Sequence, residues 1–526
     1  MEVVTIATIE IGNIHSKLLD ANISALVAVD TRLAVMTPNC NFSAAYKSGK
    51  WDGMTRFFSV ATKKFPSGLL SQVAKALDKA GEAYTIKDTR TPLGYVLPDS
   101  ITLHDPNGDI TLRDYQYDSV KQGLEATRGV INVATNGGKT EIAAGIIKCI
   151  LPKLPEGKKI LFFTHSKEIF YQSHARLEKR LQIPVGLIGD GKWEEKPVTV
   201  VMIPTISQYL SVPKTLPKNA KRTKAEKEIA SIGKSNPERV RELRDWITEF
   251  DKTEWEKIKA NVKKTKTLFS SAVAFLADEV HHASSTTWYD VFMKLENCYY
   301  RFGLTGTVDQ SDKINTNRLF GCTGRIISKI SNQFLIDNGF SAKPTVNMID
   351  TSIDEVFGDY RSAYEEGIIY NETRNNAFAA IISERAESGN QCLIIVNETS
   401  HGEEVLSILE SLGIEAVFTH GDRSTKFRNE SLEGFKNGDI RVLISTSILD
   451  EGVDVSGINC LFLMAGGKSM RQLLQRIGRG LRKKEDGSGV EVFDCLDLHS
   501  KYLAEHTLER YNTYKAEGFT VVKMEV

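Results

Sequence analysis

Residues 131–145 read INVATNGGKTEIAAG, an apolar run followed by a polar turn that ends in Gly-Lys-Thr and by a helix-forming stretch. Apolar residues before a turn predict a buried strand, and Gly137 and Gly138 leave the backbone of the turn unobstructed. Backbone N–H groups at the start of the following helix favour a bound anion such as phosphate. The stretch therefore predicts a strand, a phosphate-binding loop and a helix, a unit of nucleotide-binding α/β folds.

The loop departs from the usual spacing, which is G-x-x-x-x-G-K followed by serine or threonine. That spacing requires a glycine at position 133, where this chain has Val133. Two further Gly-Lys-Ser tripeptides occur at 233–235 and 467–469. No strand pattern precedes the first of these, and only the tripeptide at 138–140 is followed by a carboxylate pair at a strand end. The nucleotide site is therefore predicted at 138–140.

The carboxylate pair lies in AVAFLADEVHH, residues 272–282, where an apolar run leads directly into Asp278 and Glu279. In phosphoryl transfer a lysine neutralises the β- and γ-phosphates, a hydroxyl group holds magnesium and an acid anchors the water shell of the metal. We assign these three roles to Lys139, Thr140 and Asp278, and we expect Glu279 to orient and deprotonate the attacking water. The two motifs together predict a site for ATP and Mg²⁺.

From about residue 106 the chain alternates Val/Ile/Leu-rich strands with amphipathic helices, a pattern that predicts parallel α/β sheets. The strand candidates are GVINVA, KILFFT, VTVVMI, AVAFLAD, RFGLTG, QCLIIV, AVFTH, RVLIST, INCLFLM and VEVFDCL. They fall into two clusters, and the polar, turn-rich stretch at 309–325 is expected to be a hinge between them.

Residues 214–266 lie within the first cluster but have no strand pattern, and they contain 16 Lys/Arg against 9 Asp/Glu. Two interpretations remain open for this segment. It is either a solvated helical excursion or a basic arm that contacts nucleic acid.

The first 105 residues alternate short apolar runs, such as ALVAVD at 25–30, with turns, and a helical pattern follows at 67–84. This predicts a small α+β domain. In its patch YKSGKWDGMTRFF at 46–58 and the following KKF, basic residues lie among aromatic ones, a mixture that nucleic-acid surfaces use for phosphates and stacking. The alternative is a glycine turn in a hairpin whose aromatic residues belong to the core. The residues concerned are Lys47, Lys50, Arg56, Lys63, Lys64, Trp51, Phe57 and Phe58.

The composition is that of an ordinary globular protein of two to four domains, with 526 residues, 25% of them charged, and a net charge of zero. A neutral total does not exclude a nucleic-acid partner, because binding needs only a local basic surface. Seven cysteines without a CxxC pair indicate free thiols in a reducing compartment and argue against a zinc site. No apolar run approaches 18 residues and the N-terminus lacks the pattern of a signal peptide. We therefore expect a cytoplasmic protein without a membrane partner.

These motifs resemble those of the superfamily 2 helicases. Residues 278–281, Asp-Glu-Val-His, form a DExH box, and ATNGGKT at 134–140 is similar to the [A/P]TGxGKT loop of that family. Many members lack the first glycine, so the resemblance implies that Val133 is tolerated. Asn136 replaces the usual glycine, and we expect this departure to affect nucleotide turnover. The loop residues implied to bind the nucleotide are Thr135, Asn136, Gly137, Gly138, Lys139 and Thr140.

Two further motifs of the first lobe match in order. LRDYQYDSV at 112–120 resembles the segment that reads adenine, so Arg113 would stack or pack on the base and Gln116 would hydrogen-bond its edge. The alternative for this segment is a capped surface helix. GLTGT at 303–307 matches the motif that couples hydrolysis to strand movement, with Thr305 and Thr307.

The second lobe carries the remaining motifs. LISTSILDEGVDVSG at 443–457 matches motifs that contact the backbone and the ribose, with Gly452 and Asp454 nearest the nucleotide. In RQLLQRIGRGLR, Gln475, Arg479 and Arg482 fall at i, i+4 and i+7 and share one face of a helix. Guanidinium groups directed across a cleft at a γ-phosphate act as arginine fingers. We therefore expect the nucleotide site to be complete only when the two lobes close.

Within the superfamily, three stretches are similar to the bacteriophage UvsW-type DNA helicases and the related XPB-like branch. They are LRDYQ at 112–116, GDGKWE at 189–194 and FLIDNGFSAKP at 334–344. The resemblance implies an ATP-dependent DNA helicase or translocase that unwinds or remodels branched DNA, with movement 3′→5′. Its expected partners are single-stranded DNA and forked or branched duplexes. The alternatives are a DExH enzyme acting on RNA, a restriction-type translocase that never separates strands, and a nucleic-acid-binding scaffold with an inactive nucleotide site.

The resemblance implies two tandem RecA-like parallel-sheet domains, preceded by the small α+β domain. The expected bounds are 1–105 for the N-terminal accessory domain, 106–309 for the first RecA-like domain with a charged helical insertion at 211–267, 310–324 for the hinge, 325–499 for the second RecA-like domain, and 500–526 for a C-terminal tail.

Overall fold

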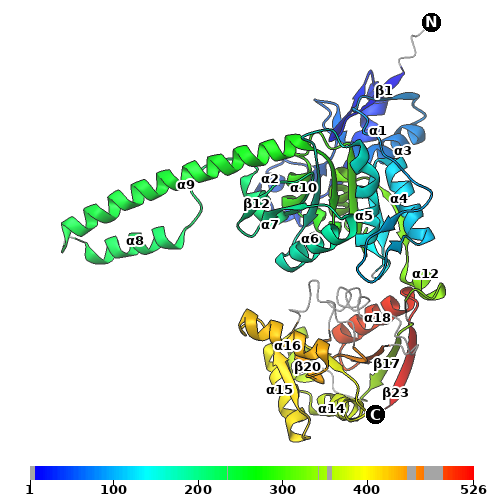
Figure 1. Cartoon of the computed structure of the whole chain (residues 1–526), viewed down its shortest axis with the longest axis vertical. Helices are drawn as coiled ribbons and strands as arrows, with labels where there is room; N and C mark the ends of the chain where they lie inside the picture. The colour runs from blue at the N-terminus through cyan, green and yellow to red at the C-terminus, as the bar shows by residue number, and fades with distance from the viewer. Residues whose placement is uncertain are drawn as a thin grey trace. The chain divides into compact units, whose positions relative to one another are not determined.

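The computed structural model describes residues 6–525 apart from 135, 234, 342, 352–357, 447–457 and 467–489. The chain forms two compact units, shown in Figure 1. Unit 1 comprises Met1–Ile131 and Thr140–Ser328, and unit 2 comprises Asn132–Lys139 and Lys329–Val526. Each unit contains a sheet with parallel strand pairs and surrounding helices, so the predicted α/β class is confirmed. None of the helices within these described ranges is long and apolar enough to cross a membrane.

The N-terminal part of unit 1 is a four-stranded sheet in the order β5-β2-β1-β6, with α1 and α3 packed against each other. The elements are β1 (Ala7–Ile11), β2 (His15–Leu19), α1 (Ile23–Leu33), β3 (Ala34–Met36), α2 (Ala44–Lys47), β4 (Met54–Arg56), β5 (Lys64–Pro66), α3 (Leu70–Ala80) and β6 (Tyr84–Asp88). The run ALVAVD, which we expected to be a short apolar run between turns, lies inside α1. Asn22 caps this helix, since its Oδ1 accepts a hydrogen bond from the backbone N of Ala25 at 2.8 Å.

Part of the basic and aromatic patch of this domain belongs to its core. Phe58 belongs to the buried core and Phe57 packs against it. The Trp51 indole donates a hydrogen bond to the carbonyl of Met54 at 3.0 Å, and Arg56 forms an ion pair with Asp30 at 3.3 Å. Phe57 and Phe58 therefore fit the alternative in which the aromatic residues belong to the core, whereas Lys47, Lys50 and Lys64 are exposed and their role stays a prediction.

Gly68 determines how the N-terminal sheet packs on the rest of unit 1. A Cβ atom at this position would collide with the backbone oxygen of Phe320 and lie 2.8 Å from the backbone oxygen of Gly321. Both atoms belong to α11 (Lys313–Cys322). The side chain of Gln72 adds a hydrogen bond to Asn317 of the same helix at 3.0 Å. Close backbone approach therefore explains the glycine in the FPSGLL stretch.

Gly68→Ala is expected to lower the free energy of unfolding of unit 1 by about 1–3 kcal/mol, because backbone atoms cannot move aside as a flexible side chain can. Urea unfolding followed by intrinsic fluorescence measures this loss. The matched control is Gly94→Ala, whose added Cβ meets only the flexible side chain of Lys153 at 3.5 Å. Equal stability of the two variants would contradict the packing role of Gly68.

The central sheet of unit 1 has the strand order β12-β11-β13-β10-β14-β15-β9-β16. Its strands are β9 (Arg128–Val133), β10 (Lys159–Thr164), β11 (Val185–Gly189), β12 (Lys192–Glu194), β13 (Val198–Met202), β14 (Ala272–Ala277), β15 (Tyr300–Thr305) and β16 (Ile326–Ile330). The other elements are β7 (Thr102–Leu103), β8 (Ile110–Thr111), α4 (Asp114–Ala126), α5 (Lys139–Ile150), α6 (Lys167–Leu181), α7 (Ile203–Ile206), α8 (Ala220–Ile232), α9 (Pro237–Ser271) and α10 (Thr286–Phe292). Strands β11, β13, β10, β14 and β15 pair in parallel, whereas β12 is antiparallel to β11.

The GDGKWE stretch forms the tight hairpin between β11 and β12. Asp190 and Gly191 occupy the turn with φ angles of 49° and 78°. Positive φ at both central residues is characteristic of the hairpin turns that Asp-Gly favours. The Asp190 carboxylate also accepts a hydrogen bond from the Tyr171 hydroxyl at 2.8 Å and pairs with Lys167 at 2.8 Å.

The stretch that we expected to be a hinge is occupied by α11. Asp312 caps this helix by accepting hydrogen bonds from the backbone N of Ile314 and Asn315 at 2.9 and 3.0 Å. Ile314, Leu319 and Cys322 are buried within unit 1. The division between the two units falls later, at Ser328–Lys329. The stretch that suggested a hinge therefore contains a helix packed into unit 1.

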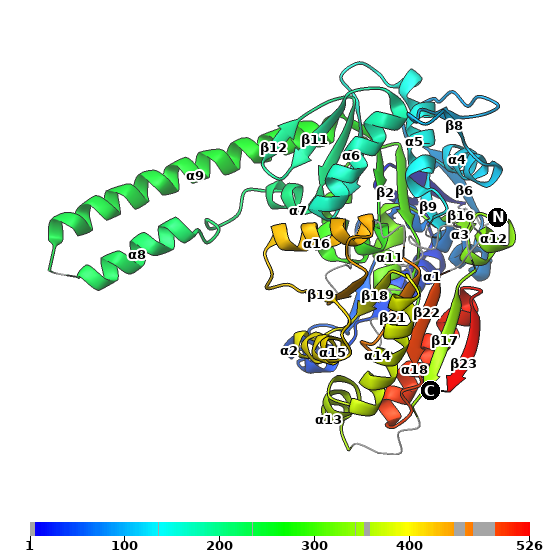
Figure 2. The same cartoon turned by 60° about the horizontal axis from the view of Figure 1, so that its bottom comes forward.

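Unit 2 contains a seven-stranded sheet in the order β19-β20-β18-β21-β22-β17-β23, in which all neighbouring strands pair in parallel. The strands are β17 (Thr345–Asp350), β18 (Cys392–Ile395), β19 (Ala416–Thr419), β20 (Val442–Ser445), β21 (Cys460–Leu463), β22 (Glu491–Cys495) and β23 (Thr520–Glu525). The described helices are α12 (Asn332–Asp337), α13 (Tyr360–Tyr364), α14 (Glu372–Glu387), α15 (Thr399–Ser411), α16 (Thr425–Asn437) and α18 (Lys501–Ala516). Figure 2 shows β23 alongside β17. The residues that we expected to form a tail therefore supply α18 and an edge strand.

Candidate nucleotide site

The phosphate-loop motif connects β9 to α5, as the sequence predicted. Lys139 is the first residue of α5 and Thr140 is the second. Asn136 and Gly138 have φ angles of 66° and 83°, and the backbone N of Gly137 donates a hydrogen bond to the carbonyl of Ala134 at 3.0 Å. Asparagine is one of the few residues other than glycine that adopts the left-handed conformation readily. Asn136 can thus replace the usual glycine without a large conformational cost.

Val133, at the position where the usual spacing has glycine, is fully buried beneath the loop. A Cβ atom at position 137 would collide with the Val133 side chain and lie 3.1 Å from the carbonyl oxygen of Ala134. The valine therefore fills the space under the turn, and Gly137 provides the room for it. The unusual residue at 133 is compatible with a closely packed loop.

The carboxylate pair follows the buried strand β14. The backbone N of Asp278 donates to the carbonyl of Phe163 on β10 at 3.0 Å, which continues the sheet to the position of the acid. The Asp278 carboxylate accepts a hydrogen bond from the backbone N of Glu279 at 2.9 Å. Glu279 has a φ angle of 47°, and its side chain is 13% exposed. A non-glycine residue in this conformation costs on the order of 1 kcal/mol, and such strain concentrates at functional sites.

His281 connects the DExH motif to the GLTGT motif. Its Nδ1 lies 3.0 Å from the hydroxyl of Thr305 and 3.4 Å from the carboxylate of Glu279. The Thr305 hydroxyl in turn lies 2.9 Å from the carbonyl oxygen of Thr307 and donates a hydrogen bond to it. The chain of contacts runs from Glu279 through His281 to the end of β15. We assigned no role to His281 from the sequence, although its position as the last residue of the DExH motif could have identified it as a functional residue.

Arg113 and Gln116 lie at the start of α4. Arg113 is the N-cap residue, and Gln116 is buried, with its Oε1 accepting a hydrogen bond from the backbone N of Arg113 at 3.0 Å. The Arg113 guanidinium donates to the hydroxyl of Tyr115 at 3.3 Å. The helix cap that we stated as an alternative is therefore present. It uses the carboxamide oxygen of Gln116, and the adenine-binding role of both residues stays a prediction.

Six of the predicted site residues lie outside the described residues. They are Thr135, Gly452, Asp454, Gln475, Arg479 and Arg482. Their assigned roles stay predictions from the motifs.

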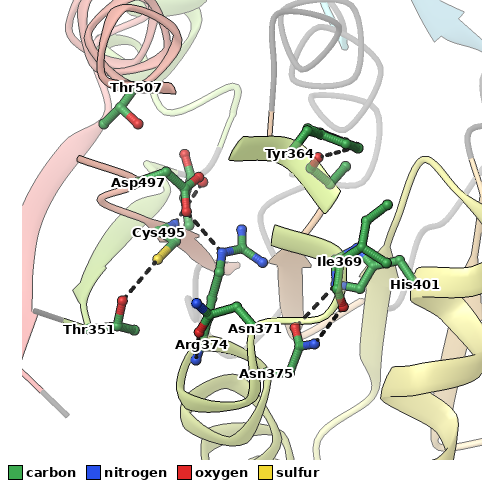
Figure 3. A network of polar contacts seen from close by, with 12 residues as sticks. Thr351, Tyr364, Ile369, Asn371, Arg374, Asn375, His401, Cys495, Asp497 and Thr507 are labelled. Carbon is green, nitrogen blue, oxygen red and sulfur yellow. Dashed lines mark hydrogen bonds and ion pairs between the residues drawn. The ribbon is translucent and has the colours of Figure 1, made fainter. Parts of the chain in front are cut away.

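A buried polar network that the sequence analysis missed lies in unit 2 (Figure 3). Arg374, at the start of α14, is fully buried and its Nε donates to Asp497 at 2.9 Å. Burial alone would raise the pKa of the Asp497 carboxyl, but the charges of Arg374 and Arg510 outweigh this effect and the pKa is lowered. Burial, together with the charge of Arg374, lowers the pKa of His401 to about 3, so this side chain is neutral at pH 7.

The same region contains a hydrogen-bonded tyrosine. The Tyr364 hydroxyl donates to the carbonyl of Ala465 at 2.8 Å and accepts a hydrogen bond from the side chain of Asn397 at 3.1 Å. Asn375 donates to the carbonyl of Ile369 at 2.8 Å. Because buried polar and charged groups require partners, these contacts indicate a structural role in holding α13 and α14 to the segments that follow β18, β21 and β22.

Two family models match the chain. "Type III restriction enzyme, res subunit" matches residues 109–310, and "Helicase conserved C-terminal domain" matches residues 373–484. The first range contains the phosphate-loop and DExH motifs, and the second contains the arginine motif. With these matches and the relatives described next, the chain is a superfamily 2 helicase that hydrolyses ATP.

The chain is similar over nearly its whole length to the ATP-dependent DNA helicase uvsW of Enterobacteria phage T4. The two are 23% identical over 529 residues, which cover 91% of each chain. The DNA 3′-5′ translocase XPB2 of Sulfurisphaera tokodaii is 24% identical over 439 residues, which cover 76% of this chain and 84% of the relative. The resemblance to UvsW-type helicases is thereby confirmed.

Solved structures that match the chain include the crystal structure of T4 UvsW, with a TM-score of 0.45, 19% identity and 99% coverage of both chains. A fragment of an HsdR subunit of a type I restriction enzyme from Vibrio vulnificus has a TM-score of 0.51 and 18% identity, with 79% of this chain and 68% of that chain covered. The second likeness supports a shared fold.

Proposed function

We propose that this chain is an ATP-dependent DNA helicase that unwinds or remodels branched DNA. The observation that carries the proposal is the match to the phage DNA helicase over 91% of both chains, which extends beyond the motor motifs into the N-terminal region. Movement 3′→5′ is part of the proposal and is supported by the similarity to a relative named as a 3′-5′ translocase. We also propose a cytoplasmic location, which the seven free thiols support.

In this proposal Lys139 neutralises the phosphates and Glu279 accepts a proton from the attacking water. The hydroxyl of Thr140 and the carboxylate of Asp278 are hard oxygen donors, the type that Mg²⁺ prefers, so the residues present fit this metal. Bound magnesium would supply positive charge to the phosphoryl oxygens. Arg479 and Arg482 add positive charge as the phosphoryl group is transferred, and the spacing of Gln475 predicts the same helix face for it.

The remaining assignments concern base recognition and coupling. Arg113 and Gln116 recognise the adenine, while Gly452 and Asp454 contact the nucleotide from the second lobe. His281 transmits the state of Glu279 to Thr305, because its Nδ1 lies near both side chains. Phosphate-backbone contacts carry no sequence information, so movement along DNA requires no base reading.

A second candidate function is a duplex translocase that does not separate strands. The match of residues 109–310 to a restriction-enzyme subunit favours it. A DExH enzyme acting on RNA is the third possibility and would depend on contacts to 2′-hydroxyl groups.

The test is ATP hydrolysis with single-stranded DNA, blunt duplex, a fork, a four-way junction and RNA, each at equal nucleotide concentration, together with strand release from 3′-tailed and 5′-tailed duplexes. We expect the strongest stimulation by forked and four-way DNA, and strand release from the 3′-tailed duplex. The translocase would be supported instead if duplex DNA stimulates ATP hydrolysis and the protein displaces a third strand from a triplex without separating the duplex. Stimulation by RNA alone would support the RNA helicase.

A further inference from the structure

Helices α8 and α9 form a two-helix arm that extends outward from the sheet of unit 1 in Figures 1 and 2. The base of the arm is the C-terminal end of α9, which leads into β14, and few contacts hold the two helices together beyond it. Ala225 and Leu243 are its buried apolar residues there, and Arg222 pairs with Asp251 at 2.9 Å across the two helices. Most of the arm therefore lies away from the sheet of unit 1.

The arm is strongly basic. Residues 214–266 contain 16 Lys/Arg and 9 Asp/Glu, in a chain whose total charge is zero. Five of the acids are already paired with basic residues of the arm. They are Glu226, Glu228, Glu242, Asp251 and Glu254. The cations that remain give the arm a positive surface that attracts polyanions.

A groove of about 480 Å³ runs between the two helices. Trp246 lines it with 42% of its surface exposed, and its ring stacks on Phe250 with centroids 4.9 Å apart. Lys221 and Lys224 line the groove from α8, are exposed, and have no acceptor for their ammonium groups in the described part of the chain.

Two acids also line the groove, and both pair with the same arginine, so the three cations of the lining exceed its acids by one. Arg239 pairs with Glu228 and with Glu242 at 3.0 Å each. The groove thus combines an exposed aromatic face with two unpaired lysines and no unpaired acid. This is the combination with which proteins bind a strand of unpaired bases, since any base can stack and the phosphates need only positive charge.

We propose that the α8–α9 groove binds an unpaired nucleic-acid strand, with one base stacked on Trp246 and the adjoining phosphates on Lys221 and Lys224. The inference rests on the proposed function, which supplies such strands when a duplex is opened or a branch is remodelled. The arm would then contact the strand at a second place, in addition to the contacts that the motor motifs make. Pockets for small molecules are concave and bury most of the surface of the ligand. This groove is open along the two helices, which suits an extended strand better than a small molecule.

The test uses the full chain and a fluorescein-labelled oligothymidylate, with affinity measured by anisotropy over a range of salt concentrations. Trp246→Ala should weaken binding about 5- to 150-fold, because stacking of one base contributes about 1–3 kcal/mol. Trp246→Phe should retain most of the affinity. The double variant Lys221→Gln with Lys224→Gln should lower the slope of log affinity against log salt by about 1.4, since each phosphate contact on a single strand contributes about 0.7.

The matched control is Lys227→Gln with Lys252→Gln, which makes the same charge change at exposed positions of the two helices outside the groove. The control should keep the parent slope, and all variants should keep the basal ATPase rate without DNA. Parent-like binding by Trp246→Ala, or an unchanged salt slope in the Lys221→Gln and Lys224→Gln double variant, would overturn the inference. Absence of any nucleic-acid binding by the parent chain would instead overturn the proposed function, so the two failures are distinguishable.

Discussion

Lys139→Ala is expected to lower the rate of ATP hydrolysis by at least about a hundredfold. A cation positioned where phosphoryl charge develops contributes on the order of 10²–10³ in rate, and truncation removes the ammonium completely. The loop conformation should survive, because it depends on Asn136 and Gly138 at positive φ and on the fit of Gly137 over Val133. Phosphate release at saturating DNA measures the loss.

The control for this variant is Lys148→Ala on the same helix. Lys148 is exposed and its ammonium donates to the carbonyl of Thr102, so its removal should leave turnover unchanged. DNA affinity of Lys139→Ala should stay within a few fold of the parent, because the loop lysine is assigned to nucleotide. Hydrolysis by Lys139→Ala at the rate of the Lys148→Ala control would show that the phosphate site lies elsewhere.

The sequence predicted most of the strands that are contiguous apolar runs, although it missed β11, whose sequence is VGLIG. KILFFT and AVAFLA became β10 and β14, which are buried because helices cover both faces of a parallel sheet. It missed β17 and β23, whose sequences TVNMID and TVVKME mix apolar and polar residues. An edge strand such as β23 can expose polar side chains, so it lacks the apolar run that identified the others.

The candidate site also has a part that the sequence predicted and a part that it missed. The phosphate loop and the carboxylate pair were visible because each is local, a strand followed directly by the functional residues. The approach of His281 to Thr305 depends on the pairing of β14 with β15, and the ion pair of Arg374 with Asp497 joins residues far apart in the chain. Contacts of this kind follow from the tertiary fold, and no spacing rule in one sequence identifies them.

The Asn136 departure illustrates what a motif alone leaves open. From the sequence it was a missing glycine with an expected effect on turnover. In the structure Asn136 adopts a φ of 66°, which accounts for the residue conformationally. Its effect on turnover remains a prediction.

Glu279→Gln is expected to lower kcat for ATP hydrolysis by about 10²–10⁴-fold while leaving KM for ATP within a few fold. Proton transfer by a positioned base contributes this much to the rate, and glutamine keeps the size and one acceptor oxygen but cannot take the proton. Because the base acts in the transition state, its loss should appear in kcat more than in nucleotide binding. Steady-state kinetics at saturating DNA separate the two constants.

The control is Glu156→Gln, the same chemical change at an exposed position on the surface of unit 1, which should leave both constants unchanged. A second readout separates a base from a residue that only shapes the loop. Glutamine can adopt the backbone conformation of Glu279 at the same cost as glutamate, so the unfolding free energy of Glu279→Gln should match that of the parent. Turnover near that of the parent would remove the base role from Glu279. A fall in kcat together with a large loss of stability would assign the residue to the structure of the loop, because a group needed only for proton transfer contributes nothing to folding.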